Sequence, residues 1–382
     1  MKGKLDILKT SMALLSSHDL CDHCLGRMFA KLSKGSNEER GRAIRLVLSM
    51  EHGISPDQPE RCELCGNVFD SIPRLVEKMM KAVEGFEFET FWVGSNFPES
   101  VITKEEELWK EFSIGTAESI KREFNRELGK CFSSATGKEP SNDPDVLFIV
   151  EPYSEEVRIE IKPIYVHGRY RKLKRGIPLT PLPGYETSVA SIICREVSRA
   201  FGGRCVFKAA GREDVDVRML GNGRPFIVEV RRPKRRRVSL SDVEIRGDVE
   251  VEWVGYVSKR DASEILSRRH RKRYRALVVV PEGITEEDLS DLCRKLEGLV
   301  VEQMTPLRVS KRRAMKVRKR RVHSASCKVI NEREFELYLL TDGGLYIKEL
   351  ISGDSGRTKP SVSSLLGKRA ECKELDVIEI ID

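Results

Sequence analysis

The sequence predicts an α+β protein in two parts: a larger part with a mixed, largely antiparallel sheet, and a smaller α/β part that carries a cysteine metal site. The chain has 382 residues, enough for two or three domains of roughly 150 residues. Strand-like segments crowd its second part without strict alternation with helices, and four of its ten cysteines form two closely spaced pairs near the start. We therefore expect one unit over residues 1–150 and another over residues 151–382.

Apolar residues at helical spacing dominate the first part of the chain. A run of turn-forming residues at 137–145 follows the last helical pattern, and we expect the hinge between the two parts near residues 142–152. This combination of patterns predicts a small α/β unit. The predicted elements are helices over residues 5–15, 43–49, 72–83 and 104–129, and strands over residues 86–94 and 146–150.

Strand patterns outnumber helical patterns in the second part. Because the two do not alternate strictly, the sequence favours a mixed, largely antiparallel sheet over a doubly wound parallel one. The predicted strands lie at residues 157–165, 205–209, 216–220, 225–230, 249–257, 276–280, 335–340 and 375–380, and the predicted helices at 187–200, 262–269 and 285–296.

Charge is distributed unevenly between the two parts. Residues 1–150 carry 20 Lys and Arg against 25 Asp and Glu, whereas residues 151–382 carry 48 against 35. The basic excess therefore lies wholly in the second part. This asymmetry is typical of a polyanion-binding module joined to a mildly acidic one.

The composition also excludes several classes of protein. No apolar run approaches the ~18–20 residues of a membrane span, and the start of the chain lacks the pattern of a secretory signal. We expect a cytoplasmic protein without a membrane partner. The sequence has neither a P-loop nor a convincing dinucleotide-binding motif, so we expect no nucleotide or other organic cofactor.

Two C-x-x-C pairs, Cys21/Cys24 and Cys62/Cys65, indicate a metal site. Two such pairs can place four thiolates around one zinc ion, and a closed four-sulfur site has no position for water and is structural. Buried free thiols and a redox dithiol are the alternatives, although a dithiol would leave one pair unexplained. The other cysteines are expected to be ordinary core or surface residues: Cys131, Cys194, Cys205, Cys293, Cys327 and Cys372.

Three basic blocks interrupt the predicted sheet, at residues 169–175, 231–237 and 308–321. Such blocks bind phosphates through counterion release, so they predict a nucleic-acid surface whose affinity falls with salt. Aromatic faces beside them can stack on unpaired bases. The aromatic residues in or beside the blocks are Tyr165, Tyr170 and Tyr274.

An acidic motif at residues 211–221 stands out against this basic background. Two chemistries fit it. Asp214 or Asp216, together with Glu229 and Arg231, could hold Mg²⁺ in a nuclease site. Alternatively, one aspartate held by a neighbouring cation could act alone as a nucleophile or base, without a metal. A strand-end turn with surface ion pairs is the structural alternative.

Several motifs, taken in order, resemble one enzyme family. Gly211-Arg-Glu-Asp214 resembles the G-R-x-D motif of pseudouridine synthases, and Lys272-Arg-Tyr274 resembles their K-x-Y strand. Residues 303–313 resemble the arginine-rich thumb loop, residues 344–349 the strand-to-helix element, and residues 165–172 the start of the forefinger loop. The string from 210 to 234 is similar to one branch. That branch is the archaeal and eukaryotic tRNA pseudouridine synthases that act on uridines 54 and 55 and carry an N-terminal THUMP domain.

The resemblance implies roles for residues of this chain. Asp214 would be the catalytic aspartate, Tyr274 would stack on the target uracil, Lys348 would form a salt bridge with Asp214, and Leu375 would close the pocket. Asp216 and Glu213 are expected to form local ion pairs. Contacts with the RNA are expected from Arg212, Arg218, Tyr165, Arg169, Tyr170, Arg308, Lys311, Arg312 and Arg313.

The resemblance further implies a pseudouridine synthase domain over residues 151–382 and a zinc-bearing, THUMP-containing RNA-binding domain over residues 1–150. The partner would be tRNA, and zinc would be the metal. Nothing in the sequence demands a dimer, so we expect a monomer. Pseudouridine formation gains and loses no atoms, so it requires no redox cofactor. A metal-dependent nuclease and a non-catalytic, zinc-stabilised RNA-binding protein remain the alternatives.

Overall fold

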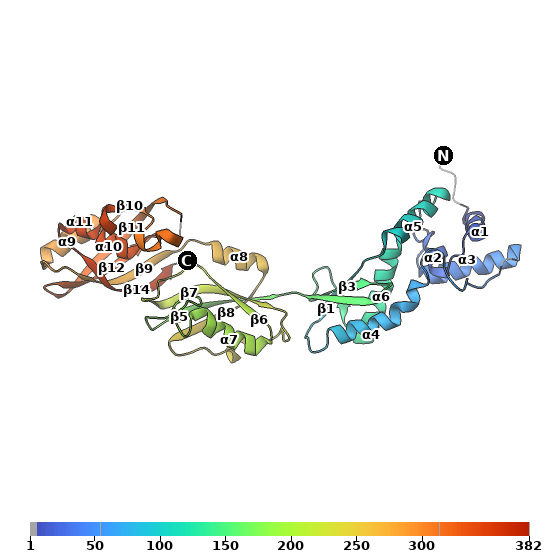
Figure 1. Cartoon of the computed structure of the whole chain (residues 1–382), viewed down its shortest axis with the longest axis horizontal. Coiled ribbons are helices and arrows are strands. Elements are labelled where there is room, and N and C mark those ends of the chain that lie inside the picture. Colours follow the sequence, from blue (N-terminus) through green and yellow to red (C-terminus); the bar gives the residue numbers. More distant parts are fainter. Residues whose placement is uncertain (1–5, 54, 313, 382) are drawn as a thin grey trace. The chain divides into compact units, whose positions relative to one another are not determined.

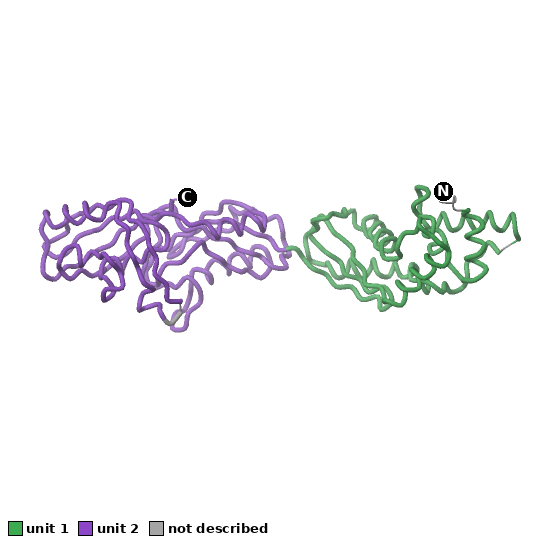
Figure 2. The backbone as a smooth tube through the Cα atoms, turned by 90° about the horizontal axis from the view of Figure 1, so that it is seen from above, with its two compact units in different colours: residues 1–162 green, residues 163–382 purple. Residues whose placement is uncertain are grey.

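The computed structural model describes residues 6–53, 55–312 and 314–381, and the chain divides into two compact units, Met1–Lys162 and Pro163–Asp382 (Figure 2). The division lies at Lys162 rather than at residue 150. The reason is local: β3 (Val146–Glu151) and β4 (Glu156–Ile161) pair as an antiparallel hairpin, and this hairpin completes the sheet of the first unit.

A four-stranded sheet packed with helices forms the first unit (Figure 1). The strands run in the order β2-β1-β3-β4, with β1 parallel to both of its neighbours. Phe91, Phe132 and Phe148 pack edge to face between sheet and helix, with ring centroids 4.8 and 4.9 Å apart. The other elements of this unit are α1 (Ile7–Ser17), α2 (Asp22–Arg27), α3 (Asn37–His52), η1 (Val68–Ser71), α4 (Ile72–Ala82), β1 (Thr90–Ser95), α5 (Glu99–Glu111), α6 (Ile120–Thr136) and β2 (Glu139–Pro140).

The single helix expected over residues 104–129 is two helices, α5 and α6. Ser113 has a φ of 51°, which ends the first helix, because few residues adopt this left-handed conformation within a helix. The hydroxyl of Ser119 accepts a hydrogen bond from the backbone N–H of Arg122 and starts the second helix. The charged pattern is continuous across this break, so the sequence alone did not reveal it.

The second unit is built on one large sheet. Its strands follow the order β13-β10-β11-β12-β9-β14-β7-β5-β8, and β6 pairs with β7 beside this path. Only the β14–β7 pair is parallel among the described strand pairs of this unit, which confirms the mixed, largely antiparallel sheet. The strands of this unit are β5 (Ile164–Lys172), β6 (Arg204–Ala209), β7 (Val217–Arg231), β8 (Val249–Val257), β9 (Arg271–Val279), β10 (Val300–Met304), β11 (Val317–Asn331), β12 (Glu334–Thr341), β13 (Thr358–Lys359) and β14 (Glu371–Ile381).

Short helices connect and cover these strands. They are α7 (Val189–Phe201), η2 (Leu240–Asp242), α8 (Lys259–Ser267), α9 (Glu286–Leu296), η3 (Leu307–Arg312), α10 (Ile347–Ser352), η4 (Asp354–Gly356) and α11 (Val362–Leu366). The strands expected over 216–220 and 225–230 form one long strand, β7. Gly221 permits this continuity, because its φ is 57° and a Cβ atom there would lie 1.9 Å from the carbonyl oxygen of Ile378 on β14.

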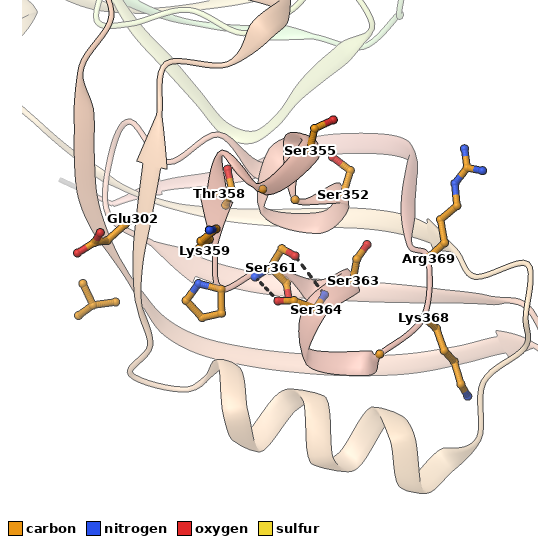
Figure 3. Close-up of a pocket in the computed structure, with 15 residues that line it drawn as sticks. Glu302, Ser352, Ser355, Thr358, Lys359, Ser361, Ser363, Ser364, Lys368 and Arg369 are labelled. Atoms are coloured by element: carbon orange, nitrogen blue, oxygen red, sulfur yellow. Dashed lines mark hydrogen bonds between the residues drawn. The ribbon is translucent and has the colours of Figure 1, made fainter.

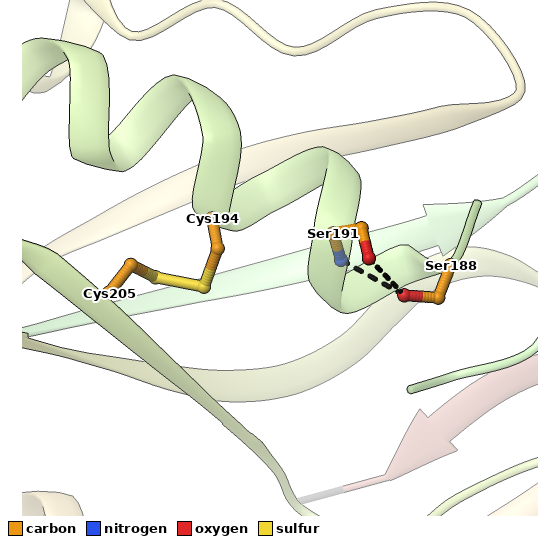
Figure 4. Close-up of a disulfide and its surroundings, with 4 residues drawn as sticks. All are labelled: Ser188, Ser191, Cys194 and Cys205. Carbon is orange, nitrogen blue, oxygen red and sulfur yellow. Dashed lines mark hydrogen bonds between the residues drawn. A yellow bond between two sulfur atoms is a disulfide. The ribbon is translucent and has the colours of Figure 1, made fainter. Parts of the chain in front are cut away.

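Four cysteines that we expected to be ordinary residues are disulfide-bonded, so that expectation was wrong for them. Cys194 on α7 is bonded to Cys205 on β6 (Figure 4), and Cys293 on α9 is bonded to Cys327 on β11. In each pair a helix packs on a strand of the sheet, and sequence spacing does not show which helix covers which strand. Among the described residues, no helix combines the length and apolar character that crossing a membrane requires.

Candidate active site

Asp214 lies in the loop between β6 and β7, and several donors hold the backbone of that loop. The ammonium of Lys172, which is fully buried, donates to the carbonyl oxygens of Asp214 and Val215 at 3.0 and 3.2 Å. The backbone N–H of Gly176 donates to Val215, and Arg175 donates to the carbonyl of Asp216. The basic block at 169–175 therefore supports the acidic loop from within, and this shell of hydrogen bonds fixes the direction of the Asp214 side chain.

The Asp214 carboxylate forms an ion pair with Arg308, whose Nη1 lies 2.8 Å from Oδ2. Arg308 belongs to η3, and its Nε also donates to the buried carboxylate of Glu349, at 2.5 Å. Burial opposes the charge of Arg308, but the hydrogen bond and the charges of Glu349 and Asp214 outweigh it and raise the arginine's pKa. Arg308 therefore stays cationic between the two carboxylates.

The pairing expected between Lys348 and Asp214 was wrong. Lys348 Nζ lies 2.6 Å from Asp216 Oδ2 instead. Burial raises the pKa of Asp216, but the bond to Lys348 outweighs it, and the net pKa is lowered. Lys348 and Glu349 are neighbours at the start of α10, and the sequence did not show which cation of the unit reaches Asp214. The local pairing expected for Asp216 is confirmed.

A cavity of about 610 Å³ opens beside Asp214. Tyr274 on β9 and Leu375 on β14 both line it, and the sheet register explains why: Val377 pairs with Tyr274, and Leu375 pairs with Ala276 on the same strand. Burial raises the pKa of Tyr274 to about 12, so its hydroxyl stays neutral. A cavity of this size can hold a nucleoside.

The predicted RNA contacts fall into two groups. Arg212 and Arg308 line the cavity. Arg218 does not; it pairs in bidentate fashion with the buried carboxylate of Asp376, through two contacts of 2.8 Å. A buried carboxylate holds the Arg218 guanidinium away from this cavity, and the phosphate contact expected from Arg218 stays a prediction.

The structure corrects the expected role of Tyr170, whereas the RNA contacts expected from Tyr165 and Arg169 stay predictions. Tyr170 is fully buried, and its hydroxyl donates to Glu213 at 2.9 Å, so it cannot stack on RNA. Tyr165 and Arg169 lie along β5 and do not line the cavity. Arg169 donates to the carbonyl oxygen of Asn222 at 2.7 Å. In β5 successive side chains point to opposite faces of the sheet. Alternate side chains of the basic block at residues 169–172 are therefore buried, although the sequence suggests an exposed basic surface.

Some expected contacts stay predictions, and two cavity-lining arginines were not expected. The side chains of Lys311 and Arg312 and the whole of Arg313 lie outside the described residues. Arg318 and Arg320, which line the cavity from alternate positions of β11, were not singled out. Their period of two was a usable signal, because it is typical of a strand with one face on the site.

The nuclease arrangement does not form among the described residues. The Glu229 carboxylate bonds Lys208 and Arg231, each at 2.8 Å, and lines no part of the cavity that holds Asp214. Asp214 and Asp216 pair with cations as described above. The one cluster of metal-ligating side chains in the described chain consists of cysteines.

Replacing Glu213 is expected to destabilise the second unit. Glu213 pairs with Arg224 at 2.8 Å, and both side chains are 1% exposed. Glu213→Gln leaves the Arg224 guanidinium buried beside a neutral partner, so we expect a loss of about 3–5 kcal/mol. Urea unfolding followed by circular dichroism measures it. An unchanged unfolding midpoint would show that the pair is not needed for stability, whereas the double variant Glu213→Gln/Arg224→Met should recover part of the loss.

The four cysteines of the two C-x-x-C pairs come together in the first unit. All four side chains are buried, and their Sγ atoms lie within 4.8 Å of one another. The arrangement could hold a metal ion, since four sulfurs at this spacing match a tetrahedral site. The members of the cluster are Cys21, Cys24, Cys62 and Cys65.

A buried arginine connects this cluster to the helices around it. Arg27 is fully buried; its Nη1 lies 3.1 Å from the Sγ of Cys24, and its Nε donates to Glu105 on α5 at 2.7 Å. His23 stacks on Phe69 instead of joining the sulfurs. The cluster is thus built into the core of the first unit.

A larger cavity, of about 1010 Å³, lies in the second unit around α11 (Figure 3). Its hydroxyl groups serve the fold: Ser361 and Ser364 cap α11 reciprocally, and Ser363 donates to the carbonyls of Ile351 and Ala370. None of the residues assigned to the site from the sequence lines this cavity.

Comparisons with known proteins identify the chain. The family model of the Pus10 C-terminal domain matches residues 165–381, and the model of the archaeal Pus10 THUMP domain matches residues 75–151. The fold, the acid–arginine pair and these matches define a two-domain chain with a synthase-type unit and a THUMP domain. The chain belongs to the Pus10 family.

Curated relatives match nearly the whole chain. The protein named tRNA pseudouridine synthase Pus10 from Pyrococcus furiosus is 55% identical over 98% of both chains. Those of the same name from Thermoplasma acidophilum and Methanopyrus kandleri are 41% and 40% identical, over 96% and 95% of this chain and 97% and 95% of their own lengths.

Proposed function

We propose that this chain is a tRNA pseudouridine synthase that isomerises uridine 54, uridine 55 or both in the TΨC arm. Family membership and the 55% identity to a protein of that name support the activity. The structural observation that carries the proposal is the ion pair of Asp214 with Arg308 at a cavity lined by Tyr274. The cavity has room for one flipped nucleoside, and its charged rim suits RNA.

Asp214 acts on the flipped nucleotide as a nucleophile or base. Its side chain is about one-third exposed, so it is open to the substrate, and the ion pair with Arg308 holds its carboxylate at the cavity. Tyr274 offers its ring to the extruded uracil, and Leu375 bounds the same space. Flipping costs a few kcal/mol, which base stacking and phosphate contacts offset. Arg212 is exposed at the cavity and binds a phosphate of the flipped nucleotide.

The four-cysteine cluster holds one structural zinc ion. Four thiolates complete the tetrahedral sphere, so the ion has no open position for catalysis. Its contribution is to the folding of the first unit, which binds tRNA through its THUMP domain. The protein works in the cytoplasm as a monomer, with tRNA as its partner.

Removing divalent cations is expected to leave turnover intact. Isomerisation at Asp214 uses no Mg²⁺, whereas a nuclease site would depend on it. With pre-folded tRNA carrying tritium at C5 of uridine, tritium release should proceed at the same rate in EDTA as in Mg²⁺, and the RNA should stay whole. Cleavage of the RNA in Mg²⁺ that stops in EDTA would favour the nuclease instead.

A further inference from the structure

Lys272 is a cation in the active-site cavity that no acidic group neutralises. It lies two residues before Tyr274 on β9, so both side chains point to the same face of the strand, and both line the cavity. Its Nζ would lie 3.7 Å from a Cβ atom on Gly211, which places the ammonium beside the start of the motif that ends in Asp214. No hydrogen bond or ion pair holds it among the described residues.

Three other cations near Lys272 are each paired with a carboxylate. Arg308 binds Asp214 and Glu349, Lys348 binds Asp216, and Arg224 binds Glu213. Glu213, the carboxylate whose charge acts on the Lys272 ammonium, is shared between Arg224 and the hydroxyl of a buried tyrosine. The uncompensated charge of Lys272 is therefore free to meet a ligand in the cavity.

We propose that the Lys272 ammonium binds a carbonyl oxygen of the flipped uracil and stabilises the negative charge that the ring acquires when it leaves the sugar. This inference rests on the proposed synthase function and deepens it. Tyr274 would stack on the face of the uracil ring, and Lys272, two residues earlier on the same strand, would contact a carbonyl oxygen at the edge of the ring.

The chemistry of the isomerisation explains why a cation is useful there. When the N1–C1′ bond breaks, its electron pair stays on uracil and spreads over the two carbonyl oxygens. The ring then rejoins C1′ through C5, the C5 hydrogen leaves as a proton, and N1 takes up a proton from water. A fixed cation beside a carbonyl oxygen lowers the energy of the anionic stage, in the way that oxyanion-binding groups do.

Position in the cavity favours the base over a phosphate as the ligand. The phosphates of a flipped nucleotide remain joined to the RNA and must stay at the rim, where Arg212, Arg268 and Arg269 are exposed. Lys272 is partly buried. Burial, followed by repulsion from Arg224, lowers its pKa to about 8, with Glu213 opposing the change. Because burial destabilises the charged form of Lys272, this ammonium is stabilised most by a hydrogen-bond acceptor that becomes negatively charged during the reaction.

Single-turnover measurements with saturating tRNA test this proposal. For Lys272→Met we expect the rate constant of pseudouridine formation to fall about 10²-fold, with an unchanged Kd for tRNA and an unchanged slope of log Kd against log salt. Arg273→Met is the matched control: Arg273 faces the other side of β9, pairs with Glu379, and does not line the cavity. Its rate constant should equal that of the wild type.

Two results would overturn the proposal. One is a normal rate constant in Lys272→Met; the other is a weakened Kd with a flatter salt slope and normal turnover at saturation, which would assign Lys272 to a phosphate. Lys272→Arg supplies an independent readout. The wild-type rate should fall as the pH rises through about 8, and arginine should remove this fall because it stays charged. Absence of pseudouridine with the wild-type enzyme would instead refute the synthase function itself.

Discussion

Asp214→Asn is expected to abolish pseudouridine formation while tRNA binding is retained. The asparagine side chain fits the same space and can still accept a hydrogen bond from Arg308, but it is neither a nucleophile nor a base at neutral pH. By analogy with the loss of a reacting side chain in other enzymes, we expect the rate to fall by about 10⁴-fold or more. Tritium release from C5-labelled tRNA under single-turnover conditions measures the rate, and filter binding measures the affinity.

Asp248→Asn is the control for this variant. Asp248 is exposed in the same unit and pairs with Lys174, away from the cavity, so its replacement should leave the rate unchanged. If Asp214→Asn releases tritium at the wild-type rate, Asp214 is not the reacting group, and the assignment of the cavity as the active site fails with it.

Cys24→Ser/Cys62→Ser is expected to remove the zinc ion that we propose for the cysteine cluster and to unfold the first unit around it. Structural zinc supplies about 10–16 kcal/mol of apparent binding free energy to small domains, and here the cysteines form part of the core. Elemental analysis should show the loss of one zinc per chain. Limited proteolysis should then cut within residues 1–162 and leave residues 163–382 resistant, since the second unit has its own core.

Cys131→Ser provides the comparison, because Cys131 is an exposed free cysteine outside the cluster. This variant should keep its zinc and its resistance to proteolysis. Zinc retained in full by Cys24→Ser/Cys62→Ser, or a first unit that resists protease without it, would contradict a structural zinc site at these four sulfurs.

Much of the site could be predicted from the sequence because several motif residues are required by the local backbone conformation. Gly211 has a φ of 92°, and a Cβ atom there would lie 3.0 Å from the Arg224 guanidinium, so the motif that ends in Asp214 requires glycine at its start. Tyr274 and Leu375 lie on the paired strands β9 and β14. The family resemblance placed both at the site, although the strand expected over residues 276–280 began two residues after Tyr274. In each C-x-x-C pair, the separation of the two cysteines is visible in the sequence and is typical of a metal site.

Contacts between distant segments could not be predicted in the same way. Arg308 reaches Asp214 from a loop 94 positions later in the chain, while Lys348, the cation expected there, turns to Asp216. Arg308 and Lys348 could pair with Asp214 and Asp216 in two ways, and the packing of the folded backbone decides which pairing forms. The same limit applies to Tyr170. The strand expected over residues 157–165 ended before it, residues 165–172 were expected to begin a loop, and the face that Tyr170 occupies depends on which sheet neighbours cover β5.

The most direct test is to incubate an unmodified tRNA transcript with the purified protein and map pseudouridine at single-nucleotide resolution, with Asp214→Asn protein in parallel. A new pseudouridine at position 54, 55 or both, absent with the variant, is the expected result. A transcript that stays unmodified with the wild-type protein, or one that carries the new base only outside the TΨC arm, would contradict the proposed function.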